Sequence, residues 1–176
     1  AFVRSLNKKF HLEESDFFAV HEAAEQVTSI RLNPFKYIDI YKESPSVPWS
    51  TWGKYLPQRP SFIADPLFHA GCYYVQEASS MFLEHIVKQT SNLEERLKVL
   101  DLCGAPGGKS TLLASLIDKD SLLVSNEIIK SRVPILSDNL TKWGTANTVV
   151  ANNDPKDFAR LTGYFDLMVI DAPCSG

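Results

Sequence analysis

Apolar residues in the second half of the chain gather in four short runs that end in polar or turn-forming residues. The runs cover residues 98–102, 121–127, 147–152 and 165–170. Their length and their content of valine, leucine and isoleucine predict buried β-strands. A helix-forming stretch at residues 111–117 follows the first run. Strands that alternate with helices predict an α/β fold whose ligands bind at the carboxyl ends of the strands.

The first half of the chain does not repeat this pattern. Ser15 is a candidate N-cap for a helix that runs to about Thr28, and the alternation at residues 37–41 predicts a short strand. Residues 44–66 are rich in proline and aromatic side chains, which predicts a loop pinned by aromatic rings. Residues 76–89 predict a helix that leads to the first strand of the sheet.

A glycine-rich segment joins the first predicted strand to its helix. It reads Asp101-Leu102-Cys103-Gly104-Ala105-Pro106-Gly107-Gly108-Lys109-Ser110. A strand, a tight turn and a helix place backbone N–H groups against an anionic or polar ligand. Cys103 stands where a phosphate-binding P-loop needs glycine, and it also interrupts the Gly-x-Gly-x-x-Gly pattern of dinucleotide folds. A nucleoside without a pyrophosphate, such as S-adenosylmethionine, remains, beside the alternative of a glycine turn without a ligand.

Two acidic residues follow the next predicted strands. Glu127 lies about 20 residues past the glycine segment, where a carboxylate at a strand end can bind both hydroxyls of a ribose. Asp154 follows the third strand and could accept a hydrogen bond from the amine of adenine. Each acid alone is also typical of a solvated strand end. Their succession after the glycine segment favours a nucleoside site.

The fourth strand is followed by Asp171-Ala172-Pro173-Cys174-Ser175-Gly176. Methyltransferases that act on exocyclic amines tend to carry Asp/Asn-Pro-Pro-aromatic at this place, whereas this chain carries Pro-Cys. Carbon-5 of cytosine becomes nucleophilic only after a thiolate adds to carbon-6. A cysteine in the pocket therefore indicates carbon rather than nitrogen as the methyl acceptor.

Together, these motifs resemble the RNA cytosine-5 methyltransferases of the Sun (Nop2/Sun) family, and in particular a bacterial ribosomal-RNA member. The match rests on the glycine segment, Asn126-Glu127, Asn153-Asp154 and the segment at 171–176, with weaker flanking pieces that include residues 30–36 and 74–80. The resemblance implies a Rossmann-like, S-adenosylmethionine-dependent α/β fold. It also implies that residues 74–176 are the first half of the catalytic domain. Residues 1–73 would form a small α+β region that contacts RNA.

The resemblance also implies roles for individual residues. The expected cofactor-binding residues are Cys103, Gly104, Ala105, Pro106, Gly107, Gly108, Lys109, Glu127, Asp154 and Asp171. The first seven would line the methionine end of the cofactor, Glu127 the ribose, and Asp154 the adenine. Asp171 would also contact the cytosine, and Cys174 would assist release of a covalent adduct between protein and RNA. These two are the expected catalytic residues.

The family's nucleophilic cysteine lies in a later Thr-Cys motif that this sequence does not contain. Three further strands would also follow, so the sequence corresponds to the fold truncated after its fourth strand. An exposed apolar strand edge there would favour aggregation. We therefore expect a segment of a longer protein that methylates cytosine carbon-5 in RNA, with 16S ribosomal RNA as the substrate. The alternatives are a non-catalytic cofactor- or RNA-binding module on the same fold and, ranked lower, a DNA cytosine methyltransferase.

Composition adds few constraints. A net charge of −3 over 176 residues argues against a generally basic nucleic-acid binder, but not against a local patch. Three cysteines do not form a disulfide framework, and we expect Cys72 to serve packing. No metal-binding spacing and no membrane span is evident, so we expect a cytoplasmic monomer without a metal. Lys54 and Arg59 could contact RNA beside the aromatic residues at 49–55, although buried anchors and a solvated cationic face are the favoured interpretation.

Overall fold

The computed structural model describes residues 13–22, 27–36 and 38–172. In chain order, the elements are α2 (Glu14–Glu22), β1 (Thr28–Leu32), β2 (Gly53–Leu56), η1 (Phe62–Ala64), α3 (Pro66–His69), β3 (Tyr73–Val75), η2 (Ser79–Met81), α4 (Phe82–Thr90), β4 (Lys98–Asp101), α5 (Gly108–Leu116), β5 (Leu122–Asn126), η3 (Lys130–Arg132), α6 (Val133–Trp143), β6 (Thr148–Ala151), η4 (Pro155–Leu161) and β7 (Leu167–Val169).

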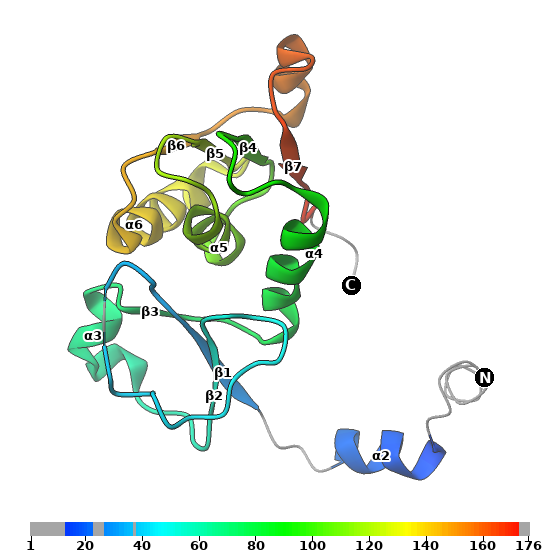
Figure 1. The fold of residues 1–176 in the computed structure, drawn as a ribbon, viewed down its shortest axis with the longest axis vertical. Helices are drawn as coiled ribbons and strands as arrows, with labels where there is room; N and C mark the ends of the chain where they lie inside the picture. The colour runs from blue at the N-terminus through cyan, green and yellow to red at the C-terminus, as the bar shows by residue number, and fades with distance from the viewer. Residues whose placement is uncertain (1–12, 23–26, 37, 173–176) are drawn as a thin grey trace.

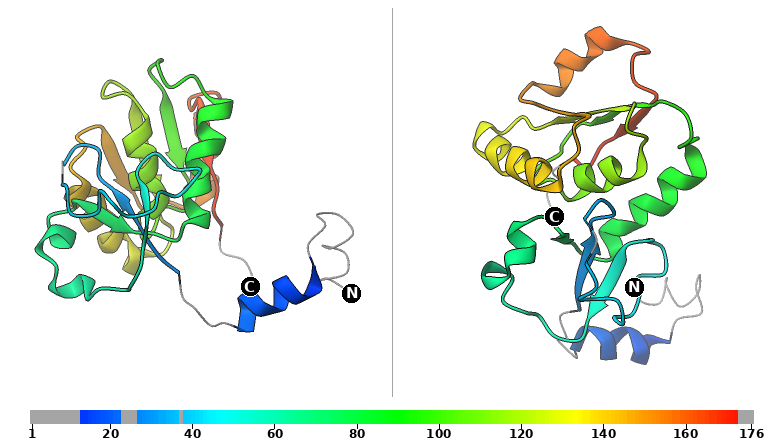
Figure 2. Two further views of the ribbon diagram at one scale, coloured as in Figure 1. Left: turned by 60° about the horizontal axis from the view of Figure 1, so that its bottom comes forward. Right: turned by 60° about the vertical axis from the view of Figure 1, so that its left-hand side comes forward.

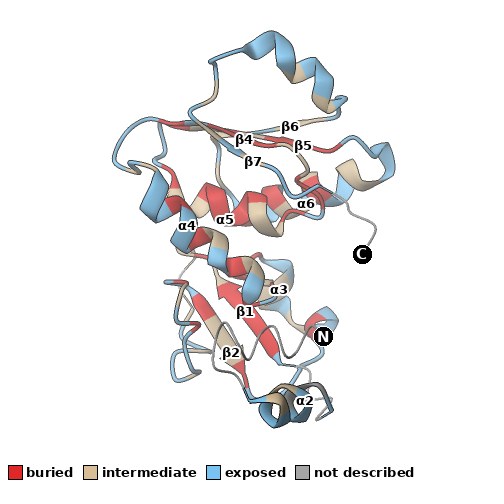
Figure 3. Ribbon diagram, turned by 90° about the vertical axis from the view of Figure 1, so that its right-hand side faces the viewer, coloured by how far each residue is buried: buried red, intermediate tan, exposed pale blue. Residues whose placement is uncertain are grey.

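Four parallel strands form one sheet in the order β6-β5-β4-β7 (Figure 1). Helices α4, α5 and α6 lie against one face of this sheet (Figure 3). On that side, Val99 and Leu123 pack in one core cluster with Val87 of α4, Leu113 of α5 and Trp143 of α6. The apolar side chains on this face of the sheet are therefore buried against the three helices, and this burial stabilises the sheet.

The other face of the parallel sheet is less covered. Val150 packs against α6, whereas its neighbour Val149 is 49% exposed. Leu167 and Val169 pack against the core, whereas Met168 between them is 47% exposed. This alternation follows from the two-residue period of a strand.

Three antiparallel strands form a second, smaller sheet in the order β2-β1-β3. Its core contains Ile30, Leu56, Phe62, Cys72 and Tyr73. The expectation that Cys72 serves packing is confirmed, because this side chain is buried in that cluster. Helices α5 and α6 lie between the two sheets, so the small sheet is built onto the helical layer (Figures 2 and 3).

The α/β prediction is confirmed, and β4, β5, β6 and β7 lie within the four predicted runs. Helix α5 begins at Gly108, before the predicted start, and the helix predicted at 76–89 appears as η2 followed by α4. Within the described ranges, no helix is long and apolar enough to cross a bilayer.

Three predictions for the first half were wrong. Ser15 lies inside α2 rather than before it, and Thr28 opens β1 rather than ending the helix. The described residues 38–41 have irregular and turn structure instead of a strand, and Tyr41 packs beside Tyr73. Local alternation there reflects side chains that cover the core of the small sheet. The proline-rich stretch contains β2, which pairs with β1 through Ser29 and Tyr55.

Candidate cofactor and active site

The sequence-derived candidate acids follow parallel strands of the larger sheet. Glu127 follows β5, Asp154 lies after β6 and Asp171 lies after β7, while Asp101 ends β4. Because the strands are parallel, their carboxyl ends meet at one edge of the sheet. The glycine segment leaves β4 at this edge and leads into α5.

Neighbouring elements hold the glycine segment in place. The amide of Gly104 donates to the carbonyl of Asn126 at 2.7 Å. From the η3–α6 region, Arg132 Nη2 donates to the carbonyl of Ala105 at 2.6 Å and Asn139 Nδ2 to that of Pro106 at 2.7 Å. The loop is therefore fixed by β5 on one side and by η3 and α6 on the other.

Two glycines meet separate requirements of this loop. Gly107 caps α5 with φ +117° and ψ 1°, a conformation that side chains rarely adopt. Gly108 begins the helix, and a Cβ at this position would lie 3.3 Å from Tyr74 Cε1 and 3.4 Å from Gln76 Nε2. The first glycine serves the turn, and the second keeps open the space beside Tyr74 and Gln76.

Asp101 lies beneath the loop and is fully buried. Its Oδ2 accepts a 2.6 Å hydrogen bond from Ser110 Oγ, whereas its Oδ1 has no hydrogen-bond partner among the described residues. Burial raises the pKa of this carboxyl, and hydrogen bonds from the Ser110 hydroxyl and the Cys103 backbone amide only partly oppose the effect. A buried oxygen without a partner is costly, which suits a site built to receive a donor from a ligand.

Glu127 is 3% exposed, although it follows the strand directly. One carboxylate oxygen accepts from the amide of Ile129 at 2.8 Å, and the other lies 3.5 Å from Arg132 Nη1. Arg132 therefore links Glu127 to the glycine loop through the carbonyl of Ala105. These two contacts place Arg132 next to the site.

Lys109 and Asp171 join α5 to the end of β7. Lys109 Nζ lies 2.6 Å from Asp171 Oδ2. Both side chains line a cavity of about 190 Å³, with most of the glycine segment on one wall and residues from β3 to η2 on the other. The lining residues are Tyr74, Val75, Gln76, Glu77, Ser80, Cys103, Gly104, Ala105, Pro106, Gly108, Lys109 and Asp171.

Cys103 reaches this cavity from the glycine segment. Burial raises the pKa of its thiol, and the negative charges of Asp101, Glu127 and Asp171 raise it further. Arg132 opposes the shift. A thiol in this environment stays protonated at neutral pH, so Cys103 is suited to packing and ligand contact rather than to nucleophilic attack.

The structure brings most, but not all, of the candidate residues to one cavity. Gly107 and Glu127 support the loop without lining the cavity. Asp154 is exposed and caps η4, where its Oδ1 accepts from the amide of Lys156 at 2.9 Å. Cys174 lies outside the described residues.

Arg31, in β1, was not selected as a site residue from the sequence. It is 1% exposed, and its Nε donates to Gln76 Oε1 at 2.8 Å. Its Nη2 donates to Thr111 Oγ1 at 2.6 Å and to the carbonyl of Gly108 at 3.1 Å, and its guanidinium stacks 4.5 Å from the ring centroid of Trp143. Burial lowers the pKa of Arg31 to about 9. Arg31 thus ties the small sheet to one cavity wall and to the first turn of α5.

Comparison with known proteins decides the family. Residues 88–176 match the family described as 16S rRNA methyltransferase RsmB/F, and residues 1–78 match the N-terminal domain of 16S rRNA methyltransferase RsmF. The chain belongs to the 16S rRNA methyltransferase RsmB/F family. The resemblance to the Sun family drawn from the motifs is thereby confirmed.

Named relatives agree with the RsmB/F assignment. The chain is 31% identical over 189 residues to ribosomal RNA small subunit methyltransferase F of Shewanella sediminis (strain HAW-EB3), covering 99% of the chain and 39% of that protein. It is 34% identical over 113 residues to the human 28S rRNA (cytosine(4447)-C(5))-methyltransferase, covering 64% of the chain and 13% of that protein. The chain therefore spans well under half the length of these relatives.

Solved structures agree with the RsmB/F fold. A methyltransferase homolog protein from Pyrococcus horikoshii superposes with a TM-score of 0.74 at 28% identity, over 90% of this chain and 54% of that chain. The NSun6 protein from Pyrococcus horikoshii, solved with SFG, gives a TM-score of 0.56 at 26% identity, over 70% of this chain and 31% of that chain. The predicted Rossmann-like methyltransferase fold is therefore confirmed.

Proposed function

We propose that the protein carrying this chain transfers a methyl group from S-adenosylmethionine to carbon-5 of a cytosine in 16S ribosomal RNA. One observation carries the proposal. Within a chain of the RsmB/F family, the glycine segment, Lys109 and Asp171 line one cavity at the carboxyl edge of the parallel sheet. Ligands of open α/β folds bind at this edge.

The residues at this edge suit S-adenosylmethionine. Gly108 leaves open the space that a Cβ would fill beside Tyr74, and Asp101 Oδ1 can accept a hydrogen bond from an ammonium group. The two oxygens of the Glu127 carboxylate match the paired hydroxyls of a ribose. We therefore assign the methionine end to residues 103–109, the ribose to Glu127 and the adenine amine to Asp154.

The acceptor side of the proposed site rests on Asp171 and Cys174. When bound, S-adenosylmethionine supplies the electrophilic methyl group. Lys109 holds the Asp171 carboxylate at the cavity, where it can accept a hydrogen bond from the cytosine amine. In this proposal, Cys174 helps to release the covalent adduct between the protein and RNA.

The proposal includes further assignments of partner, location and domain organisation. The partner is ribosomal RNA, and the protein acts as a cytoplasmic monomer. Residues 1–73 form an RNA-contacting region, and residues 74–176 form the first half of the catalytic domain. No group of three or more metal-ligating side chains occurs among residues 13–22, 27–36 and 38–172, and the proposed reaction uses no metal.

The test is formation of 5-methylcytidine in 16S rRNA. The protein carrying this chain is incubated with S-adenosylmethionine labelled on its methyl group, and the RNA is digested and its nucleosides are separated. We expect label in 5-methylcytidine, none with Asp171→Asn, and normal transfer with Asp138→Asn, which alters an exposed acid on α6. Label in another nucleoside would contradict the proposal. Cofactor binding without transfer would favour a non-catalytic module.

A further inference from the structure

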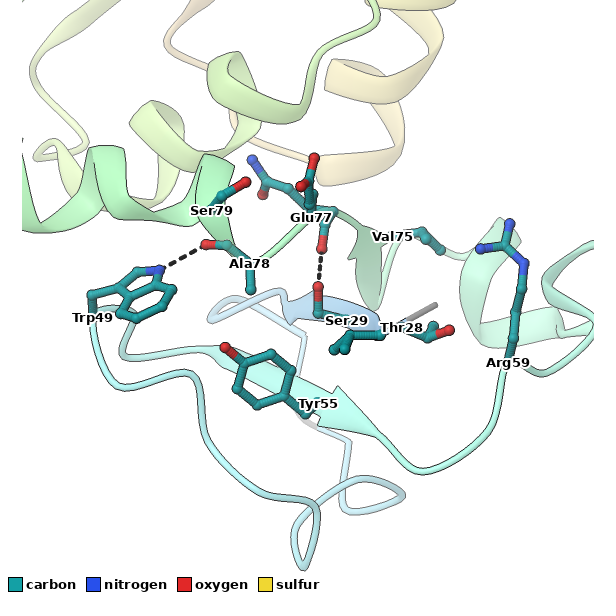
Figure 4. Close-up of a pocket in the computed structure, with 11 residues that line it drawn as sticks. Thr28, Ser29, Trp49, Tyr55, Arg59, Val75, Glu77, Ala78 and Ser79 are labelled. Carbon is teal, nitrogen blue, oxygen red and sulfur yellow. Dashed lines mark hydrogen bonds between the residues drawn. The ribbon is translucent and has the colours of Figure 1, made fainter. Parts of the chain in front are cut away.

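A second cavity, of about 950 Å³, lies in the small-sheet region. Residues 75–77 line both this cavity and the cofactor cavity, so the two are neighbours that share a wall. The new cavity is further lined by Thr28 of β1, Tyr55 of β2, and Trp49 and Arg59 from the proline-rich stretch (Figure 4). None of these four residues has a part in the cofactor site.

The aromatic walls of this cavity are held in position. Trp49 Nε1 donates to the carbonyl of Ala78 at 2.7 Å, and its ring meets Phe82 edge to face, with 6.1 Å between the ring centroids. Tyr55 is fixed by strand pairing with Ser29 and by its amide, which donates to the carbonyl of Pro45 at 2.8 Å. Both side chains are only partly buried, so ring surface faces the cavity (Figure 4).

Several polar groups at the cavity have no partner among the described residues. Thr28 is 6% exposed, and its hydroxyl makes no hydrogen bond to any described residue. The hydroxyl of Tyr55 is likewise unengaged within the described ranges. Arg59 stacks 5.4 Å from the ring centroid of Phe62 and has no carboxylate at ion-pair distance among the described residues. In contrast, the Ser29 hydroxyl is used, since it donates to the carbonyl of Gln76 at 2.6 Å (Figure 4).

Among the described residues of the lining, the one acidic side chain is Glu77. Figure 4 shows this side chain pointing away from Trp49 and Tyr55, and it also lines the cofactor cavity. The remainder of the described lining therefore offers two aromatic faces, a cation without an ion-pair partner, and three hydroxyls, those of Thr28, Tyr55 and Ser79, that make no hydrogen bond to a described residue. Aromatic faces bind bases by stacking, and Arg and hydroxyl groups bind phosphate and base edges.

We propose that this cavity binds an unpaired nucleotide of the RNA substrate, next to the cytosine that enters the cofactor cavity. The inference rests on the proposed function, because the shared wall matters only if RNA approaches that cavity. Trp49 and Tyr55 stack on the base, and Arg59 neutralises a phosphate. The expectation that this aromatic cluster only anchors a loop is then incomplete, since Trp49 both anchors the loop and presents its ring.

The test measures the affinity of the chain for a fluorescein-labelled, single-stranded RNA dodecamer by fluorescence anisotropy. Tyr55→Leu removes a ring and a hydroxyl, and Arg59→Gln removes the cation. Each is expected to weaken binding about tenfold, and Arg59→Gln should also lower the slope of log affinity against log salt by about one. The matched controls are Tyr164→Leu and Arg96→Gln, which change exposed residues outside the cavity lining and should leave affinity unchanged.

Melting curves and S-adenosylmethionine titration accompany each variant. Tyr55 packs against a core cluster, so Tyr55→Leu is expected to melt at a lower temperature, but every variant should be folded at the assay temperature and bind S-adenosylmethionine like the unchanged chain. Cavity variants that bind the dodecamer as tightly as the controls would overturn the proposal. Failure of the unchanged chain to bind the RNA while it binds S-adenosylmethionine would overturn this subsite and leave the cofactor assignment standing. Free cytidine monophosphate that competes at the affinity of the dodecamer would identify a mononucleotide pocket instead and likewise overturn it.

Discussion

Replacing Gly107 and Gly108 by alanine, one at a time, should separate folding from cofactor binding. The two glycines are neighbours at the start of α5 but have different environments. Gly107 has φ +117°, and an added Cβ would lie 3.2 Å from Asn139 Cβ. Gly108 is the first residue of the helix, and its added Cβ would face Tyr74 and Gln76 in the cofactor cavity.

The expected magnitudes follow from these environments. Alanine at 107 would occupy a sparsely populated backbone region, which costs about 1–3 kcal/mol of stability. Alanine at 108 has an ordinary helical backbone and is favoured over glycine there by up to about 1 kcal/mol. Its methyl group, 3.3 Å from Tyr74 Cε1 and 3.4 Å from Gln76 Nε2 before small side-chain shifts, would instead take up space in the cavity that the cofactor needs. Crowding of the bound cofactor by about 1–3 kcal/mol corresponds to a Kd for S-adenosylmethionine about 5–150-fold higher.

The assay combines urea unfolding with isothermal titration of S-adenosylmethionine for both variants. Gly107→Ala should unfold at lower urea, while Gly108→Ala should unfold at or above the midpoint of the unchanged chain and bind the cofactor more weakly. The reasoning is refuted if Gly108→Ala binds S-adenosylmethionine with unchanged affinity. It is also refuted if Gly107→Ala is as stable as the unchanged chain.

Three further predictions concern titrating groups. Because burial raises the pKa of Cys103, its alkylation by iodoacetamide should rise with pH around a midpoint above about 8.5 and slow when S-adenosylmethionine is bound; mass spectrometry checks both. Burial also raises the pKa of Asp101, so its stabilising contribution is present at low pH and is lost as pH rises through the folded-state pKa. Asp101→Asn should therefore melt higher than the unchanged chain at pH 7, with the difference vanishing below about pH 4. Burial raises the pKa of Glu84, but hydrogen bonds from Lys88, Ser50 and Thr51 together lower it by more than burial raises it. The net pKa of Glu84 is therefore lowered. Glu84→Gln should cost about 1–3 kcal/mol in urea unfolding at pH 7, and this loss should fade as pH drops below about 4; an equal loss at both pH values would contradict the assignment.

The sequence predicted best those features that a short stretch of residues determines by itself. Each strand of the parallel sheet is a short apolar run bounded by polar or turn residues, and such a run can be recognised without knowledge of its long-range contacts. The glycine segment predicted a turn and a helix start, and Gly107 meets that requirement through its positive φ. The link from Lys109 to Asp171 could not be predicted, because it depends on β7 pairing beside β4.

The small sheet was less predictable for the same physical reason. β1 pairs with β2 and β3, which lie far away in sequence, and these contacts decide the structure of Thr28 and of the residues after it. Arg31 appeared only as part of a flanking resemblance. Its partners lie on β3–η2, α5 and α6, so its burial and its role at the cavity wall arise only when the small sheet packs on the helices.

The most direct test of the cofactor site is isothermal titration of this chain with S-adenosylmethionine, beside Glu127→Gln and the exposed control Glu94→Gln. The substitution at 127 keeps the size of a buried side chain but removes its charge. Loss of hydrogen bonds to a charged group, about 1.5–3 kcal/mol, should weaken binding at least about tenfold, while the control binds normally. Binding that Glu127→Gln leaves unchanged would contradict the assignment of the ribose, and absence of binding in the unchanged chain would contradict the cofactor site itself.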